Sequence, residues 1–244
     1  MYLFGKKALF DNLDKEIKMV YIYKPSNEIL TLLKKNNISY EVLKNDVFFK
    51  KFDKKLNHQN IAILLNNDEN TSLKDYLNSI NDQQKQLILI VDSVQDPQNF
   101  GAILRTAEGF GVDAVIYKKN NQVQINELVN KTIIAGMMTS DSMGAVANLK
   151  LFKVANLVNE INLLKEKGFW VYASCLDETS HDYSKVKYDN KTALIVGNEN
   201  NGISPLVQKH SDFKIKIRMF GKVQSFNVSV STGILLSEIR KQIN

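Results

Sequence analysis

The sequence of 244 residues has few of the side chains that build disulfides and metal sites. Cys175 is its only cysteine, so an internal disulfide cannot form, and a reducing, cytoplasmic location is expected. The three histidines, His58, His181 and His210, lie far apart in the sequence and show no metal-ligand spacing. We therefore expect no bound metal.

Long hydrophobic runs are missing as well. The longest apolar stretches, such as residues 87–91, have the length of a strand, so neither a membrane span nor a membrane partner is expected. Near the N-terminus no long apolar stretch is followed by a cleavage site, which argues against a secretion signal. Hydrophobic residues still make up 44% of the chain, which is enough to form a core.

Arginine is scarce although the chain is basic. The net charge is +6, yet among 32 basic residues only Arg105, Arg218 and Arg240 are arginine. A basic chain suits a partner that carries phosphate, although many soluble proteins are equally basic without such a partner. Because lysine is used wherever a positive charge suffices, an arginine can mark a place that needs a planar, forked donor.

Residues 1–66 are predicted to form a small α/β domain. Its helix patterns cover 6–13 and 26–36, and its strand patterns cover 19–23, 39–43 and 61–65. Within this domain, Phe52 lies among the lysines at 50, 51, 54 and 55. Such a mixture can bind a phosphate backbone and stack on a base, although a solvated surface explains so short a run equally well.

The remainder of the chain is predicted to be a linker and a larger domain. Residues 67–86 are polar except for a short amphipathic piece near 73–80, which favours a linker. From 87 to 244, apolar strands alternate with helices, which predicts a parallel sheet covered on both faces. The predicted strands are 87–91, 114–117, 152–154, 169–173, 192–196 and 213–217, and the predicted helices are 99–110, 127–134, 157–167, 205–209 and 226–243.

Unusual residues follow three of these strands, at the place where open α/β sheets bind ligands. In residues 91–107 a strand and a polar turn lead to Asn99, which can cap a helix or face a ligand. Gly101 and Arg105 share one face of that helix, and a glycine there costs helix stability while permitting close approach to the backbone. Taken alone, this segment fits a capped surface helix with an incidental arginine better than it fits a ligand site.

The second segment runs from an apolar strand into Gly197, Glu199 and Gly202, and Ser204 is the predicted cap of the helix that follows. The glycines allow close approach of a ligand, but the Gly-Lys-Ser/Thr of a phosphate-binding loop is absent. A carboxylate in this loop favours a cofactor with positive charge or hydroxyl groups over a pyrophosphate. A turn that simply needs glycine is the alternative.

The third segment, residues 215–236, contains a strand, a loop and the start of a long terminal helix with Ser225 as its predicted cap. One side of this helix carries unusually small side chains. The small residues allow close helix packing, including contact with another subunit, or they fill the core of a single chain. Neither spacing nor composition identifies a reaction here.

Together and in this order, the three segments resemble the SpoU/TrmH family of RNA ribose 2′-O-methyltransferases, within the SPOUT superfamily. The matching motifs are Asn99-x-Gly101-x-x-x-Arg105-x-Ala107, Gly197-x-Glu199-x-x-Gly202 and Ser225-Phe226-Asn227-Val228-Ser229-Val230. The resemblance covers residues 87–244. Residues 4–8 and 58–61 are more loosely similar to the small RNA-binding domain of the RlmB-like branch, whose fold resembles certain ribosomal proteins.

This resemblance implies a fold, a cofactor and partners. The fold is an α/β sheet whose C-terminal segment forms a deep trefoil knot, and the cofactor is S-adenosylmethionine. The chain is expected to be a homodimer with its active site near the subunit contact, and to bind a structured RNA. The matching cofactor positions are Gly197, Ile217, Met219, Phe226, Asn227 and Val228, and the expected RNA-binding residues are Lys6, Lys7, Lys50, Lys51, Lys54, Lys55 and His58.

Arg105 matches the residue that the family uses to act on the ribose hydroxyl, and we predict that it is catalytic. Arginine normally stays protonated, so a role as the base requires surroundings that favour loss of the proton. A more conservative role is to hold the RNA phosphate and stabilise the developing alkoxide. Asn99, Glu199, Ser225 and Asn227 match the positions that support this residue and the cofactor.

The sequence departs from the family pattern at three positions. Arg218 replaces a common proline, Phe226 a common leucine, and Asn60 a usual glycine. The first two leave the knot possible, because backbone groups bind the cofactor, but they affect the expected substrate geometry.

The branch indicates a guanosine of 23S ribosomal RNA as the substrate, with transfer RNA as the second choice. A non-catalytic RNA-binding assembly factor is the alternative from another class, and the motif residues Asn99, Arg105, Glu199 and Asn227 argue against it. A Rossmann-type dehydrogenase lacks support, because Gly109 and Gly111 follow a helix instead of a strand.

Overall fold

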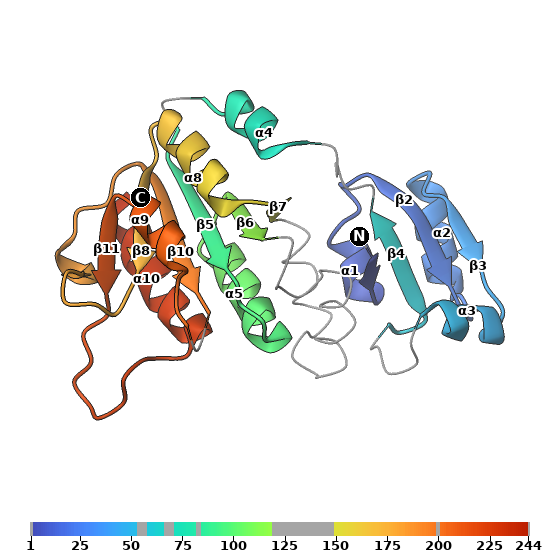
Figure 1. The fold of residues 1–244 in the computed structure, drawn as a ribbon. Helices are drawn as coiled ribbons and strands as arrows, with labels where there is room; N and C mark the ends of the chain where they lie inside the picture. The colour runs from blue at the N-terminus through green and yellow to red at the C-terminus, as the bar shows by residue number, and fades with distance from the viewer. Residues whose placement is uncertain are drawn as a thin grey trace. The chain divides into compact units, whose positions relative to one another are not determined.

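A computed structural model of the chain describes residues 2–52, 58–65, 71–81, 84–118, 149–198 and 201–243. The chain divides into two compact units. Of the described residues, the first contains 2–52 and 58–65, and the second contains 71–81, 84–118, 149–198 and 201–243. Figure 1 labels the helices and strands of both units.

The first unit contains a four-stranded mixed sheet in the order β1-β4-β2-β3. β4 runs antiparallel to β1 and β2, whereas β2 and β3 are parallel. The strands are β1 (Tyr2–Phe4), β2 (Ile17–Ile22), β3 (Tyr40–Val42) and β4 (Ile61–Leu65), and the helices are α1 (Lys6–Phe10), α2 (Asn27–Lys35) and α3 (Asn45–Lys51). β1 and α3 were not predicted from the sequence, and α1 ends earlier than predicted.

Helix α2 shows how local sequence determines an element of this unit. The Ser26 hydroxyl caps it by accepting the backbone N–H of Ile29 at 3.3 Å. Lysines in the last turn suit the negative end of the helix dipole. Ile29 and Leu33, one turn apart, are buried. The helix predicted at 26–36 is therefore confirmed, and it is both capped and amphipathic.

The second unit is built around a seven-stranded sheet in the order β7-β6-β5-β10-β8-β11-β9. Every neighbouring pair is parallel. The strands are β5 (Gln86–Asp92), β6 (Ala114–Lys118), β7 (Lys150–Val154), β8 (Trp170–Ser174), β9 (His181–Asp182), β10 (Lys191–Gly197) and β11 (Phe213–Lys216). The prediction of a parallel α/β sheet is confirmed, and β9 is the strand that was not predicted.

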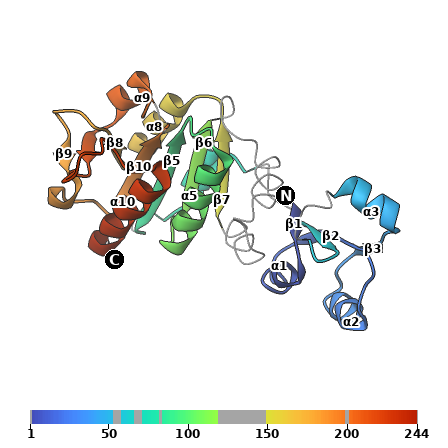
Figure 2. The ribbon, with the colours of Figure 1, turned by 90° about the horizontal axis from the view of Figure 1, so that it is seen from below.

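Helices cover both faces of this sheet (Figure 2). They are α4 (Leu73–Ser79), α5 (Pro97–Gly109), α8 (Leu157–Glu166), α9 (Pro205–His210) and α10 (Val228–Ile243), with a 3-10 turn η1 (Tyr183–Lys185). α4, α8 and α9 share a core with one face, whereas α5 and α10 pack together on the other. Within the described part of the chain, no helix is long and apolar enough to span a membrane. The helix predicted at 127–134 lies outside the described residues.

Part of the segment that was predicted to be a linker is folded. The Ser72 side chain caps α4 by accepting the Asp75 backbone N–H at 3.1 Å. Leu73, Tyr76 and Leu77 are buried in the core of the second unit. Residues 71–79 therefore belong to that unit, and the amphipathic piece recognised in the sequence is a packed helix instead of part of a linker.

Candidate active site

The carboxyl ends of β5 and β10 lie side by side near the centre of the seven-stranded sheet. From β5 the chain continues through α5 to β6 on one side, whereas β10 pairs with β5 on the other. Asp92 and Gly197, the last residues of the two strands, lie opposite each other. A point at which the strand order reverses in this way is where open α/β sheets bind ligands.

The loop after β10 turns back sharply on the end of its strand. Asn198 and Gly202 form an antiparallel bridge with two backbone hydrogen bonds of 2.9 Å. Gly202 has a φ of +65°, which favours glycine. A Cβ on Gly197 would lie 2.3 Å from the carbonyl carbon of Gly202. Both glycines are thus required by the turn itself, and Glu199 lies outside the described residues.

A buried carboxylate ties the ends of β5 and β10 together. The Asp92 side chain accepts the backbone N–H of Ser204 at 2.8 Å and the Ser93 hydroxyl at 2.9 Å. The Asn198 side chain donates to the Ser93 carbonyl oxygen at 2.8 Å. Ser204 is the N-cap of α9, as predicted, although its side chain makes no capping hydrogen bond. Asp92 was not singled out from the sequence, although an acid directly after an apolar strand is a detectable signal.

Two asparagines join the first turns of α5 and α10. The Asn227 side-chain amide donates to Asn99 Oδ1 at 2.9 Å. Asp96 caps α5, so Asn99 lies inside the first turn and is not the cap. Asn227 Oδ1 also accepts the backbone N–H of Ser229 at 2.9 Å. The cap of α10 is therefore Asn227, and the prediction that Ser225 caps this helix is wrong.

The small residues of α10 serve packing against α5 within one chain. An added Cβ on Gly233 would lie 3.6 Å from the Thr106 methyl group. Thr232 is buried, and its hydroxyl donates to the Val228 carbonyl oxygen at 2.6 Å. On α5, Gly101 is buried and Arg105 is exposed.

The residues predicted to bind the cofactor lie at the ends of two strands and at the start of α10. Gly197 ends β10, and Ile217 and Met219 follow β11 as half-buried side chains. Phe226 is exposed, whereas Val228 is buried. In the sheet β8 separates β10 from β11, so the structure brings these residues to one edge of the sheet but not to one loop.

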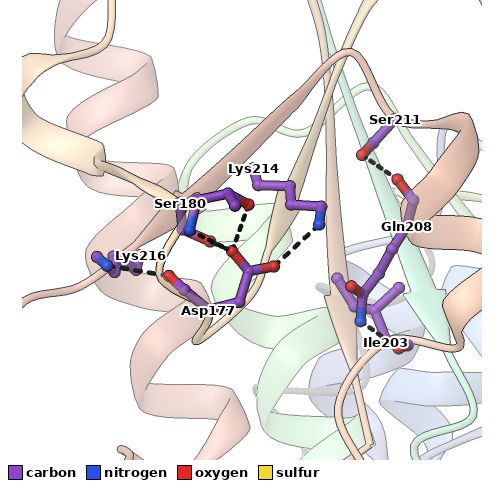
Figure 3. A network of polar contacts seen from close by, with 8 residues as sticks. Asp177, Ser180, Ile203, Gln208, Ser211, Lys214 and Lys216 are labelled. Carbon is purple, nitrogen blue, oxygen red and sulfur yellow. Dashed lines mark hydrogen bonds and ion pairs between the residues drawn. The ribbon is translucent and has the colours of Figure 1, made fainter.

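A polar network organises the loop between β8 and β9 at the same edge (Figure 3). The Asp177 carboxylate accepts the Thr179 hydroxyl at 2.5 Å and the Lys214 ammonium at 2.9 Å. Lys216 donates to the Asp177 carbonyl oxygen at 2.9 Å. The Thr179 hydroxyl and then the Lys214 ammonium hold the pKa of Asp177 far below its ordinary value. This network fastens the β8–β9 loop to β11.

A second pair of bonds in Figure 3 supports the loop after β10. Gln208 on α9 donates its side-chain amide to the Ile203 carbonyl oxygen at 2.7 Å. The Ser211 hydroxyl in turn donates to the Gln208 carbonyl oxygen at 2.6 Å. The end of the Gly197–Gly202 turn is therefore held from α9 as well as from Asp92.

The described lysines that were predicted to bind RNA lie at two places in the first unit, and all of them are exposed. Lys6 and Lys7 begin α1, and the Lys6 backbone N–H donates to the Gln59 side chain at 3.0 Å, which joins this turn to the loop before β4. Lys50 and Lys51 end α3, and the Lys51 ammonium lies 3.6 Å from the centre of the Tyr21 ring. Lys54 and Lys55 lie outside the described residues.

His58 does not lie on the surface, which corrects its prediction as a direct RNA contact. Its side chain is 6% exposed and packs between Phe48 and Phe49, with ring centres 5.0 and 5.3 Å away. Nδ1 accepts the backbone N–H of Asn60 at 2.9 Å. Burial lowers the pKa of this imidazole, which favours its neutral form, and the ring supports the loop before β4 from the interior.

Comparison with known proteins identifies the class to which this fold and site belong. The model of the SpoU rRNA Methylase family matches residues 86–237. An uncharacterized tRNA/rRNA methyltransferase of Borreliella burgdorferi is 40% identical over 238 residues, which cover 93% of this chain and 99% of the relative. The chain therefore belongs to the SpoU family of RNA methyltransferases.

Solved structures share the fold over the whole chain. The AdoMet-bound rRNA methyltransferase from Sinorhizobium meliloti has a TM-score of 0.76 at 23% identity, covering 100% of this chain and 87% of its own. An RNA 2′-O ribose methyltransferase has a TM-score of 0.69 at 21% identity, covering 99% and 88%.

Proposed function

We propose that the chain is an S-adenosylmethionine-dependent RNA 2′-O-ribose methyltransferase of the RlmB-like branch, acting on a guanosine of 23S ribosomal RNA. The observation that carries this proposal is the 2.9 Å bond between Asn99 and Asn227. It joins the first and third motifs at the sheet edge where the Gly197–Gly202 turn of the second motif also lies. Motifs that are far apart in the sequence thus meet where such sheets bind ligands.

The residues at this edge suit S-adenosylmethionine. The turn that starts at Gly197 leaves no room for a Cβ, because the backbone of Gly202 and Ile203 lies directly against the end of β10. The backbone at Ile217 and Phe226 would contribute further polar groups for the hydroxyls and the base of a nucleoside, with Met219, Asn227 and Val228 beside them. When bound, the cofactor supplies a methyl group activated by a positively charged sulfur.

Arg105 is proposed to act on the ribose. The Asn99–Asn227 bond and the packing of α10 against α5, the helix that carries Arg105, support this role. Its guanidinium can bind the RNA phosphate through two donors and stabilise the negative charge that develops on the 2′ oxygen. Ser225 and Glu199 are proposed to support this site.

The remaining features follow from the family branch. The C-terminal segment is proposed to form a trefoil knot, and the chain is proposed to form a homodimer. The first unit is proposed to bind RNA, because Lys6, Lys7, Lys50 and Lys51 are exposed on it. Transfer RNA is the second candidate substrate, since the 40% identical relative is described as a tRNA/rRNA methyltransferase.

Methyl transfer from labelled S-adenosylmethionine tests the proposal. Unmodified 23S ribosomal RNA and transfer RNA are offered side by side, and the labelled nucleotide is mapped. We expect label on one ribose 2′ oxygen of ribosomal RNA. Arg105→Ala should lower the rate at least about a hundredfold, as loss of a transition-state donor does, while cofactor affinity stays unchanged. Lys209→Ala on α9 is the control. Label on a base, or equal loss of cofactor binding in Arg105→Ala, would contradict the assignment.

A further inference from the structure

A strongly exposed aromatic side chain lies in the loop between β11 and α10. Phe220 is 89% exposed, the largest exposed fraction among the large hydrophobic residues that the structure describes. Val223 in the same loop is 63% exposed. In Figure 1 this loop projects away from the sheet and its helices. The ring contributes little to the core, and with Val223 it leaves apolar surface on this loop that a ligand can cover.

Arg218 lies beside this ring. Its guanidinium carbon is 5.3 Å from the centre of the Phe220 ring, within the range of a cation–π contact. Lys222 adds a second positive charge, and residues 217–227 contain no acidic residue. Arg218 stands where the family commonly has proline, so this pair is a feature of this chain and not of the shared motif. An exposed, flat and basic surface complements a polyanion that carries flat bases.

The fold places this loop at the candidate active site. It starts after β11 and ends at Asn227, whose side chain contacts Asn99 on α5. In the sheet, β8 and β10 lie between β11 and β5. Strands are spaced roughly 4.8 Å apart, so the loop must cross about 14 Å past the ends of β8 and β10. Arg218 and Phe220 therefore border the edge where the proposed reaction takes place.

We infer that Arg218 and Phe220 bind an unpaired nucleotide of the RNA substrate next to the methylated ribose. Phe220 stacks on the base, and the Arg218 guanidinium binds the neighbouring phosphate. Stacking on a protein ring requires a base that has left its helix, which is how proteins recognise single-stranded RNA. The inference rests on the proposed function and adds a requirement for local single-stranded structure at the target.

Fluorescence anisotropy with a short, unstructured RNA of about 12 nucleotides tests this contact. The full chain and its Phe220→Ala and Arg218→Ala variants are compared with Lys222→Ala, which removes one charge from the same loop. We expect the first two to weaken binding about tenfold, in line with loss of one stacked base, and Lys222→Ala to weaken it less. Phe220→Trp should restore binding. On an RNA of the same length with abasic positions, Phe220→Ala should have no effect, which a general structural defect would not reproduce.

The other outcomes overturn the inference in distinguishable ways. The contact is ruled out if the parent chain and Phe220→Ala bind equally well. It is also ruled out if the parent chain does not bind the single strand. A shift of Phe220→Ala to a smaller mass in light scattering assigns the ring to a second copy of the chain. Methyl transfer by the parent chain, measured in parallel, reports on the proposed function separately. If Phe220→Ala weakens RNA binding but the parent chain transfers no methyl group, the nucleotide contact is supported and the proposed reaction is rejected.

Discussion

Gly197 is the residue at which the geometry leaves the least freedom. A methyl group there would lie 2.3 Å from Gly202 and 2.4 Å from Ile203, so the turn must shift. Gly197→Ala is expected to abolish S-adenosylmethionine binding in titration calorimetry and to lower the free energy of unfolding by about 1–3 kcal/mol. Gly221→Ala, whose methyl group would meet nothing within 4 Å, is the control. Equal cofactor affinity in the two variants would show that the turn is not the cofactor site.

Cys175 gives the chain a sensitivity to alkaline pH. Burial, and then the nearby Asp177 carboxylate, raises the pKa of its thiol from 9.0 to about 11. The folded state therefore holds this proton more tightly than the unfolded state. The resulting stabilisation is complete below pH 9 and is lost as the pH rises toward about 11. Cys175→Ala should thus show a shallower fall of the free energy of unfolding over this range in urea titrations. Parallel curves for the two proteins would refute this role of the thiol.

Helices α5 and α10 are joined at their far ends by Arg240. Its Nε donates to the Phe110 carbonyl oxygen at 2.8 Å, and a second nitrogen donates to the Gly111 carbonyl oxygen. An ammonium cannot reproduce this fork. Arg240→Lys is expected to lower the free energy of unfolding by about 1–2 kcal/mol, measured by urea denaturation. Lys241→Arg, at the next and exposed position, should change it little. A loss no greater than that of the control would mean that one donor suffices.

The elements that the sequence predicted well are those with strong apolar patterns. β5 and β10 are buried along almost their whole length, and their continuous apolar runs were recognisable. β1 and β9 have three and two residues, too few for a periodic signal. The cap of α10 was misplaced by two positions, and for α5 the sequence left open whether Asn99 caps the helix, because several possible capping side chains lie close together in both segments. At α10, Asn227 caps the helix and its side chain also donates a hydrogen bond to Asn99.

The arrangement of the site depends on contacts that no local pattern contains. Asp92 binds Ser204 across 112 positions, and Asn99 binds Asn227 across 128. The motif order predicted which segments matter, whereas the hydrogen bonds between them come from the sheet topology. His58 was placed among the RNA-binding residues by the family resemblance alone, whereas the structure encloses it between aromatic rings.

The first unit is proposed to capture RNA, and the salt dependence of RNA binding can locate the capture surface. Each lysine that contacts a phosphate releases counterions, so its loss reduces the slope of log affinity against log salt concentration by about 0.7–0.9. Lys6 and Lys7 begin α1, and Lys34 and Lys35 end α2, all exposed. Replacing Lys6 and Lys7 by alanine should reduce the slope by up to about 2 units without altering cofactor affinity. The Lys34→Ala and Lys35→Ala pair changes the net charge equally and should leave the slope nearly unchanged. Because overall charge is matched, a difference between the pairs must come from contact. Equal slopes for the two pairs would show that RNA does not contact the start of α1. The end of α3, with Lys50 and Lys51, would then be the candidate surface.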